Sequence, residues 1–166
     1  PYTGKICLFG GAFSEGGSWG SKKDIFEFDP LSASISMLLE KLPEVRSRAT
    51  AFYPDESGEI YIVGGDLSGF PRSDILIFDP VSKTFTTSSV SLPKPLAYAG
   101  GAYVSDIRTA YILGGSTYVF QSQYMLNDIV EIRFFELLPP SGLTASLVEG
   151  SKVRLDWLPS PSANAA

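Results

Sequence analysis

The residues that most often carry enzymatic or metal chemistry are scarce in this chain. Histidine is absent, and Cys7 is the single cysteine among 166 residues. Catalytic triads that need histidine, Cys/His dyads and the zinc or iron sites built on these ligands are therefore excluded within the chain. Cys7 lies in the apolar run Ile6–Phe9, which predicts a buried and inert thiol. We expect no catalytic residue, no metal site and no cofactor.

Two further patterns could suggest chemistry. Asp24, Asp74 and Asp128 recur at offsets of 50 and 54 residues, each just before an apolar segment. Carboxylates can act as acids or bases, but repetition in every unit favours a structural hydrogen-bonding role. The glycine-rich stretch from Gly10 to Gly20 lacks the Gly-Lys-Ser/Thr of a phosphate-binding loop, and no helical pattern follows it. Phosphate binding is therefore not predicted.

Aromatic and arginine side chains in loops are the remaining candidates. Such residues supply much of the binding energy in protein interfaces, and loops commonly carry binding residues. The partner would be a protein or a glycan. The alternative, in which the aromatic residues only pack the loops down, stays open. The predicted binding residues are Phe13, Trp19, Arg46, Arg48, Phe70, Arg72, Tyr118 and Tyr124.

Charge and hydropathy limit the class of partner. The chain has 13 Lys plus Arg against 18 Asp plus Glu, a net charge of -5. This balance argues against nucleic acid or an anionic membrane as the partner. No apolar run reaches the roughly 18–20 residues that cross a bilayer, so the sequence predicts a soluble protein. An intracellular adaptor and a secreted or surface protein are both compatible with it.

The elements that must position the candidate residues repeat along the chain. Three apolar runs end in a double glycine, at offsets of 54 and 50 residues, and a second segment that starts with aspartate follows each. We call these repeats the first, second and third units. The glycines are expected to adopt positive φ where the chain leaves a strand. The structural motif consists of Gly10, Gly11, Gly64, Gly65, Gly114 and Gly115.

Each unit is predicted to contain four short antiparallel strands. The first strand is rich in small residues, the second runs into the double glycine, the third starts at the aspartate, and the fourth lies near Ile35–Leu39 or Phe85–Ser89. The second and third strands are apolar on both faces, so the sheet must be covered on both sides. Because the strands are antiparallel, the loops that connect the second strand to the third lie at the same end of every sheet. These loops are Ala12–Lys23, Asp66–Ser73 and Ser116–Asn127.

At these positions the chain resembles the kelch repeats of β-propellers, whose unit of about 50 residues runs into a double glycine and carries later aromatic residues. The resemblance covers about residues 1–137 and implies an all-β fold, a partial kelch-type propeller of about two and a half four-stranded blades. Ile35, Leu96 and Ile132 depart from the pattern in the first and third units. The second unit matches best, through Arg46, Tyr61, Gly64, Gly65, Phe78, Asp79 and Phe85.

The propeller pattern is incomplete at both ends. The first unit begins at its second strand, and Pro139–Pro140 leave no room for a fourth strand in the third unit. Kelch-like propellers are commonly closed by a strand from the other terminus, so the resemblance implies that the missing strands and blades belong to a larger ring. If the chain were complete, self-association would have to cover its open sides.

Residues 138–166 change character. A proline-rich joint precedes two alternating segments, from Leu143 and from Lys152, separated by a Glu149–Gly150 turn. This pattern resembles the opening of a fibronectin type III domain and implies the first strands of a β-sandwich, with Trp157 in its core. The alternative is a propeller tail packed on the side of the ring.

The resemblance implies a function without catalysis. Kelch propellers serve as scaffolds that bind proteins through a loop face. The alternative is the C-terminal part of a galactose-oxidase-like or other carbohydrate-active propeller enzyme, with its catalytic residues outside this chain. The copper site of those enzymes uses histidines and a cysteine-linked tyrosine, and nothing of it can be placed here. A kelch propeller followed by fibronectin modules resembles host-cell-factor-like nuclear adaptors as well as secreted or surface proteins of microbes.

Overall fold

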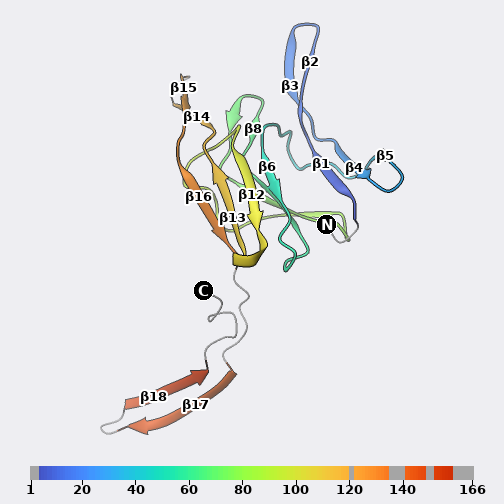
Figure 1. Cartoon of the computed structure of the whole chain (residues 1–166). Coiled ribbons are helices and arrows are strands. Elements are labelled where there is room, and N and C mark those ends of the chain that lie inside the picture. Colours follow the sequence, from blue (N-terminus) through green and yellow to red (C-terminus); the bar gives the residue numbers. More distant parts are fainter. Residues whose placement is uncertain (1–3, 120–121, 135–140, 149–151, 159–166) are drawn as a thin grey trace.

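The computed structural model describes residues 4–119, 122–134, 141–148 and 152–158, which form β-strands, one short 3-10 turn at Ser105–Ile107 and no α-helix (Figure 1). The predicted all-β class is confirmed. Within the described ranges, no helix has the length and apolar character needed to cross a membrane. The strands of the three units are β1 (Ile6–Phe9), β4 (Ile25–Asp29), β5 (Ser34–Met37), β6 (Thr50–Phe52), β7 (Ile60–Val63), β10 (Ile75–Asp79), β11 (Thr84–Thr87), β12 (Gly100–Val104), β13 (Thr109–Leu113) and β16 (Ile129–Arg133).

Each unit forms its own antiparallel sheet. The second sheet has the order β11-β10-β7-β6, which confirms the predicted four-stranded meander. The first sheet is β1-β4-β5 and the third is β12-β13-β16. Asp29 and Asp79 end the third strands of the first two units, and their carboxylates accept the amides of Leu31 (2.9 Å) and Val81 (2.8 Å). Hydrogen bonds from an aspartate carboxylate to the amide two residues further along the chain are typical of turns, so Asp29 and Asp79 stabilise the turns that follow these strands.

The second sheet is covered on both faces, as its apolar pattern predicts. Phe78 and Ile62 lie on the face toward the first sheet, in a cluster that includes Phe9 and the half-buried Cys7. Burial raises the pKa of the Cys7 thiol, in agreement with an inert group. Val63 and Ile75 lie on the opposite face and pack with residues of the third sheet such as Ile112. The core therefore consists of two layers of apolar side chains, one between the first and second sheets and one between the second and third.

The double glycines connect neighbouring units through their backbone. The first glycine donates its amide to the carbonyl of the recurrent aspartate, as in Gly64 N to Asp74 O at 3.1 Å. The second glycine donates across to the next unit, from Gly11 to Arg46 O (2.9 Å) and from Gly65 to Leu96 O (2.8 Å). All six glycines of the motif have positive φ, as predicted.

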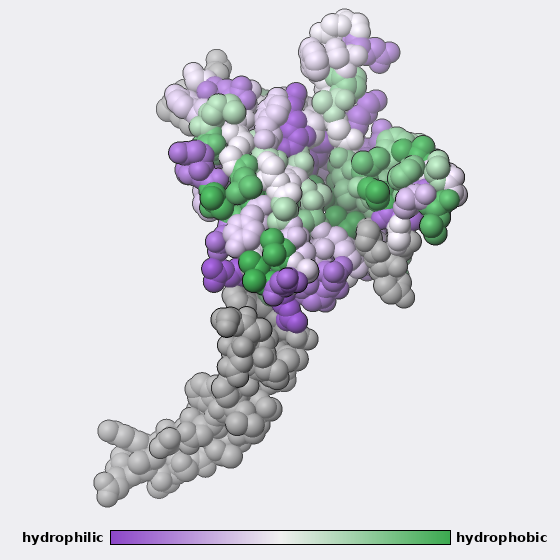
Figure 2. All heavy atoms as spheres, in the orientation of Figure 1, coloured by the Kyte–Doolittle hydropathy of each residue, from purple (hydrophilic) through white to green (hydrophobic). Residues whose placement is uncertain are grey.

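The outer face of the first sheet is apolar and exposed. Ile6, Leu8, Ile35 and Met37 have exposed fractions between 47% and 61%, and strand pairing places them on one face. Figure 2 shows hydrophobic colour over this sheet. The predicted two-sided covering therefore holds for the second sheet, whereas among the described residues the first sheet is covered on one face only.

Glu27 gives a pH-dependent contact between the first two units. Its carboxylate accepts hydrogen bonds from Lys83 of the second unit and from Lys5 at 3.3 Å. The Lys83 hydrogen bond, against the opposing effect of burial, holds the pKa of Glu27 below its ordinary value of 4.5. A lowered native pKa stabilises the fold above pH 4.5, and this contribution disappears as the pH falls through the native pKa.

We therefore expect Glu27→Gln to lower the melting temperature at pH 7 and to have little effect in acid. Thermal unfolding followed by circular dichroism between pH 2 and 7 measures the difference between the two proteins. A difference of equal size at pH 2 and pH 7 would assign the effect to side-chain packing instead of charge.

Residues beyond the third unit form a separate two-stranded sheet (Figure 1). Strands β17 (Ser141–Val148) and β18 (Lys152–Leu158) pair antiparallel, with an irregularity in the register between Ser141 and Thr144. The two strands predicted for this region are confirmed. The Glu149–Gly150 turn lies outside the described residues.

Candidate functional site

The connection from second to third strand folds as a small β-hairpin in every unit. These hairpins are β2 (Ala12–Glu15) with β3 (Ser18–Ser21), β8 (Asp66–Leu67) with β9 (Phe70–Pro71), and β14 (Ser116–Val119) with β15 (Ser122–Met125). The labelled hairpin strands stand at the same end of the three sheets (Figure 1). We call this end the hairpin face. The sequence predicted loops here, and the structure shows regular strands instead.

Large apolar side chains extend from the hairpins into solvent. Trp19 is 75% exposed and Phe70 is 74% exposed, and both lie on hairpins of the first two units. Tyr124 (51%), Met125 (77%) and Tyr118 (41%) are exposed on the third hairpin. Because exposed aromatic residues contribute strongly to protein interfaces, this end of the molecule is the best candidate for a binding surface.

Not every predicted aromatic residue faces the same way. Phe13 is opposite Gly20 and its ring lies against that glycine, where a Cβ would come within 2.6 Å of it. Lys22 Nζ covers the Phe13 ring at 4.5 Å from the centroid. Trp19 is opposite Ser14 and therefore lies on the other face of the hairpin. Phe13 thus packs its own hairpin, which leaves Trp19 for contact with a partner.

The two tyrosines of the third hairpin also lie on opposite faces. Tyr124 is paired with Thr117, and Tyr118 is paired with Gln123 one position further along the strands. Directly opposed residues share a face, and successive residues alternate between faces. A single flat partner surface can therefore contact one of the tyrosines but not both.

The three predicted arginines are engaged in ion pairs. Arg46 is buried at 2% exposure and binds Asp74 with two nitrogens, at 3.3 Å and 2.7 Å. Arg72 contacts Asp74 and Glu44, both at 3.2 Å. The structure places Arg46 inside the protein, so its side chain cannot contact a partner at the hairpin face, contrary to the prediction that it is a binding residue. Arg72 is one-third exposed at the base of the β8–β9 hairpin.

Arg48 belongs to a network that the sequence did not reveal. It is ion-paired with Asp66, a buried residue whose carboxylate also accepts hydrogen bonds from Ser47 Oγ and, at 3.1 Å, from the amide of Gly69. The Arg48 guanidinium lies 4.8 Å from the centre of the Tyr98 ring, which is 51% exposed. This network ties the β8–β9 hairpin to the second and third units.

Arg48 and Tyr98 occupy equivalent positions, 50 residues apart. Both have positive φ, 56° and 60°, and the amide of Tyr98 donates to Arg48 O at 3.0 Å. Non-glycine residues adopt this conformation rarely, and the recurrence shows that the repeat imposes it. The offset of 50 residues from Arg48 was the sequence signal that could have identified Tyr98 as part of this site.

The recurrent aspartates have the structural role that repetition predicted. Their carbonyls accept the first-glycine amides, and their carboxylates bind Lys41 (2.9 Å), Arg46 (2.7 Å) and Lys94 (2.7 Å) in the three units. Burial raises the pKa of Asp74, but hydrogen bonds and charge from Arg46 and Arg72 outweigh this and leave it below its ordinary value. In the parts of the chain that the structure describes, no three His, Cys, Asp or Glu side chains form a group that could hold a metal ion.

No protein-family model matches the chain. No curated protein matches it in sequence.

Proposed function

We propose that this chain is part of a kelch-like β-propeller that binds a protein partner without catalysis, through the hairpin face. Three similar sheets stack face to face, and each sends a hairpin from the same end. The observation that carries the proposal is the exposure of Trp19 and Phe70 at the ends of two of these hairpins. Rigid sheets beneath the hairpins would hold these side chains in fixed positions, which reduces the entropy lost on binding.

The division of the chain follows from the same proposal. Residues 1–137 would form propeller blades, and residues 138–166 would begin a fibronectin type III-like domain, to which the β17–β18 hairpin would belong. The exposed apolar face of the first sheet supports further sheets stacking there, from the same polypeptide or from another copy. A second sheet at this position would repeat the packing between the first and second units.

The test of the binding surface uses peptides selected from a displayed random library on the immobilised chain. We expect Trp19→Ala with Phe70→Ala to weaken binding of the selected peptides by about tenfold or more. Tryptophan is enriched among the few interface residues whose truncation costs about 2 kcal/mol or more. The melting temperature should stay unchanged because both side chains are exposed. Affinity is measured by isothermal titration calorimetry.

Leu31→Ala is the matched control. Leu31 is 98% exposed and lies in the turn between β4 and β5, at the other end of the first sheet. The substitution removes an exposed apolar side chain and leaves the hairpin face unchanged. An equal loss of peptide affinity in Leu31→Ala and in the double variant would contradict the proposed surface.

A further inference from the structure

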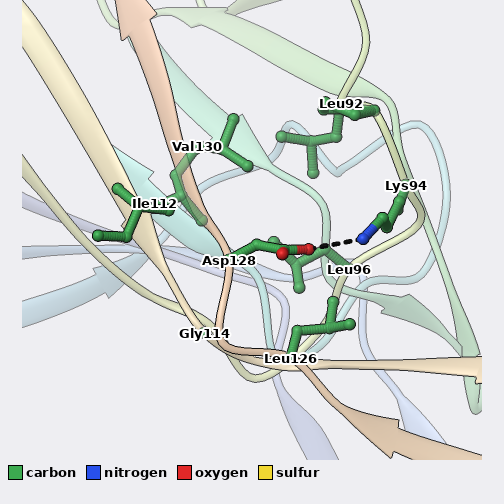
Figure 3. A pocket seen from close by; sticks show the side chains of 10 residues that line it. Leu92, Lys94, Leu96, Ile112, Gly114, Leu126, Asp128 and Val130 are labelled. Carbon is green, nitrogen blue, oxygen red and sulfur yellow. Dashed lines mark hydrogen bonds and ion pairs between the residues drawn. The ribbon is translucent and has the colours of Figure 1, made fainter.

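A cavity of about 290 Å³ lies between the second and third sheets (Figure 3). It is close to the hairpin face, because Gly114 and Leu126 in its lining lie at the two ends of the β14–β15 hairpin. Its walls are mostly leucine, isoleucine and valine side chains. The Asp128 carboxylate lies among them and binds Lys94 at 2.7 Å, as the dashed line in Figure 3 shows. The residues that line the cavity include Leu92, Leu96, Ile112, Gly114, Leu126 and Val130.

The second unit shows what occupies the equivalent place there. Counted by the repeat offsets of 50 and 54 residues, Leu96 corresponds to Arg46 and Asp128 to Asp74. In the second unit the Arg46 guanidinium donates to the Asp74 carboxylate and, at 2.7 Å, to the carbonyl oxygen of Gly64. Gly114 is the equivalent of Gly64. A built-in arginine thus bridges a carboxylate and a glycine carbonyl.

The third unit keeps this framework without the arginine. The amide of Gly114 donates to Asp128 O at 3.0 Å, as that of Gly64 does to Asp74 O at 3.1 Å. Leu126 also stands where the second unit has Arg72, and Lys94 where it has Glu44. Two guanidinium groups are therefore replaced by shorter apolar side chains, and a lysine at the cavity opening supplies the charge that balances Asp128.

We propose that this cavity binds an arginine side chain of a protein partner. The guanidinium would take the place that Arg46 fills in the second unit, on the Asp128 carboxylate and the Gly114 carbonyl. Its methylene groups would lie along the apolar walls. The inference rests on the proposed function in one respect, namely that the partner is a protein that approaches the hairpin face.

Two observations favour arginine over other occupants. A carboxylate beside a carbonyl matches the planar, multidentate guanidinium better than the compact ammonium of lysine. The present partner of Asp128 is a weak competitor, because Lys94 and Asp128 have exposed side chains (57% and 44%), and exposed ion pairs contribute little. Lys94 can turn into solvent when a guanidinium arrives.

The experiment titrates acetyl-Gly-Arg-Gly-amide into the whole 166-residue chain and follows NMR signals of the cavity. We expect saturable shifts of the Ile112 and Val130 methyl groups, with clearly weaker binding of the matching lysine peptide. Asp128→Asn should lower the affinity for the arginine peptide by about tenfold, and Lys94→Ala should raise it. Absence of saturable shifts, or equal binding of the lysine peptide, overturns the proposal.

Two variants complete the test. Leu96→Arg restores the residue of the second unit, so its own side chain should fill the cavity and abolish peptide binding while the fold is kept. Asp24→Asn changes the equivalent aspartate of the first unit and should leave binding unchanged. The Trp19→Ala and Phe70→Ala double variant should also bind the tripeptide normally, so failure of the cavity and failure of the hairpin face give different results.

Discussion

Replacing Gly64 with valine is expected to unfold the second unit. Gly64 has φ of +60°, and a Cβ there would lie 2.4 Å from the backbone oxygen of Leu96 and 3.2 Å from Leu92 Cδ1. The left-handed conformation alone costs a branched residue about 1–2 kcal/mol. The clash adds to this cost because the Leu96 oxygen belongs to the backbone. Relieving the clash requires this oxygen to move, and it is the acceptor of the Gly65 amide that links the second and third units. Total stabilities of about 5–15 kcal/mol leave little margin for such a change.

Gly58→Val separates the two causes. Gly58 has φ of +68°, close to that of Gly64, but in the part of the chain that the structure describes a Cβ there would meet nothing within 4 Å. We expect this variant to keep a cooperative transition at a lower urea midpoint, while Gly64→Val shows none. Equal midpoints for the two variants would mean that the close approach of Leu96 is unimportant, and would count against the packing of the units described above.

The second large effect is expected at the ion pair between Arg46 and Asp74. Arg46 is 2% exposed, and its Nε is buried without a hydrogen-bond partner among the described residues, so the charge depends on Asp74 and the Gly64 carbonyl. Asp74→Asn should destabilise the protein by about 3 kcal/mol, because loss of one partner leaves a buried charge uncompensated. Chemical denaturation at pH 7 measures the loss.

The other two units supply matched controls for this prediction. Asp24 and Asp128 hold the equivalent position, directly before β4 and β16, but their lysine partners are exposed by 39% and 57%. Their replacement by asparagine should cost less than about 1 kcal/mol. Adding Arg46→Leu to Asp74→Asn should recover part of the loss, since the third unit already carries leucine there. Equal destabilisation by all three asparagine variants would refute the role given to burial.

The repeat made the strands predictable. Strands into the double glycine and strands after the aspartate occur three times, so each copy supports the assignment of the others. The positive φ of the glycines followed from the same recurrence. Stacking of the second sheet between two others could be predicted because its central strands are apolar on both faces.

The hairpins were harder to predict because their strands are short and mostly polar. A local signal was nevertheless present in the first unit, where Gly16 and Gly17 both adopt positive φ between β2 and β3. Two consecutive residues with positive φ are what a tight hairpin turn requires, and glycine pairs favour it. In the second unit Ser68 and Gly69 do the same, although serine gives no such signal by itself.

Burial of Arg46 could not be predicted from its own position. Arginine is usually exposed, and a loop arginine beside aromatic residues resembles a binding residue. Its partner Asp74 is 28 residues further along, directly before β10, and reaches Arg46 only after the sheet has formed. Tertiary contacts of this kind decide whether an arginine stabilises the interior or faces a partner.

The glycine amides that cross between units also determine how cooperatively the protein folds. In a chain of similar units, stability is the sum of each unit's own stability and the coupling between neighbours. Gly11 N to Arg46 O and Gly65 N to Leu96 O are backbone bonds of that coupling, and shortening the Arg46 or Leu96 side chain removes neither group. Hydrogen exchange at these two amides therefore reports the free energy of separating adjacent units, and similar values at both would show that the units open together.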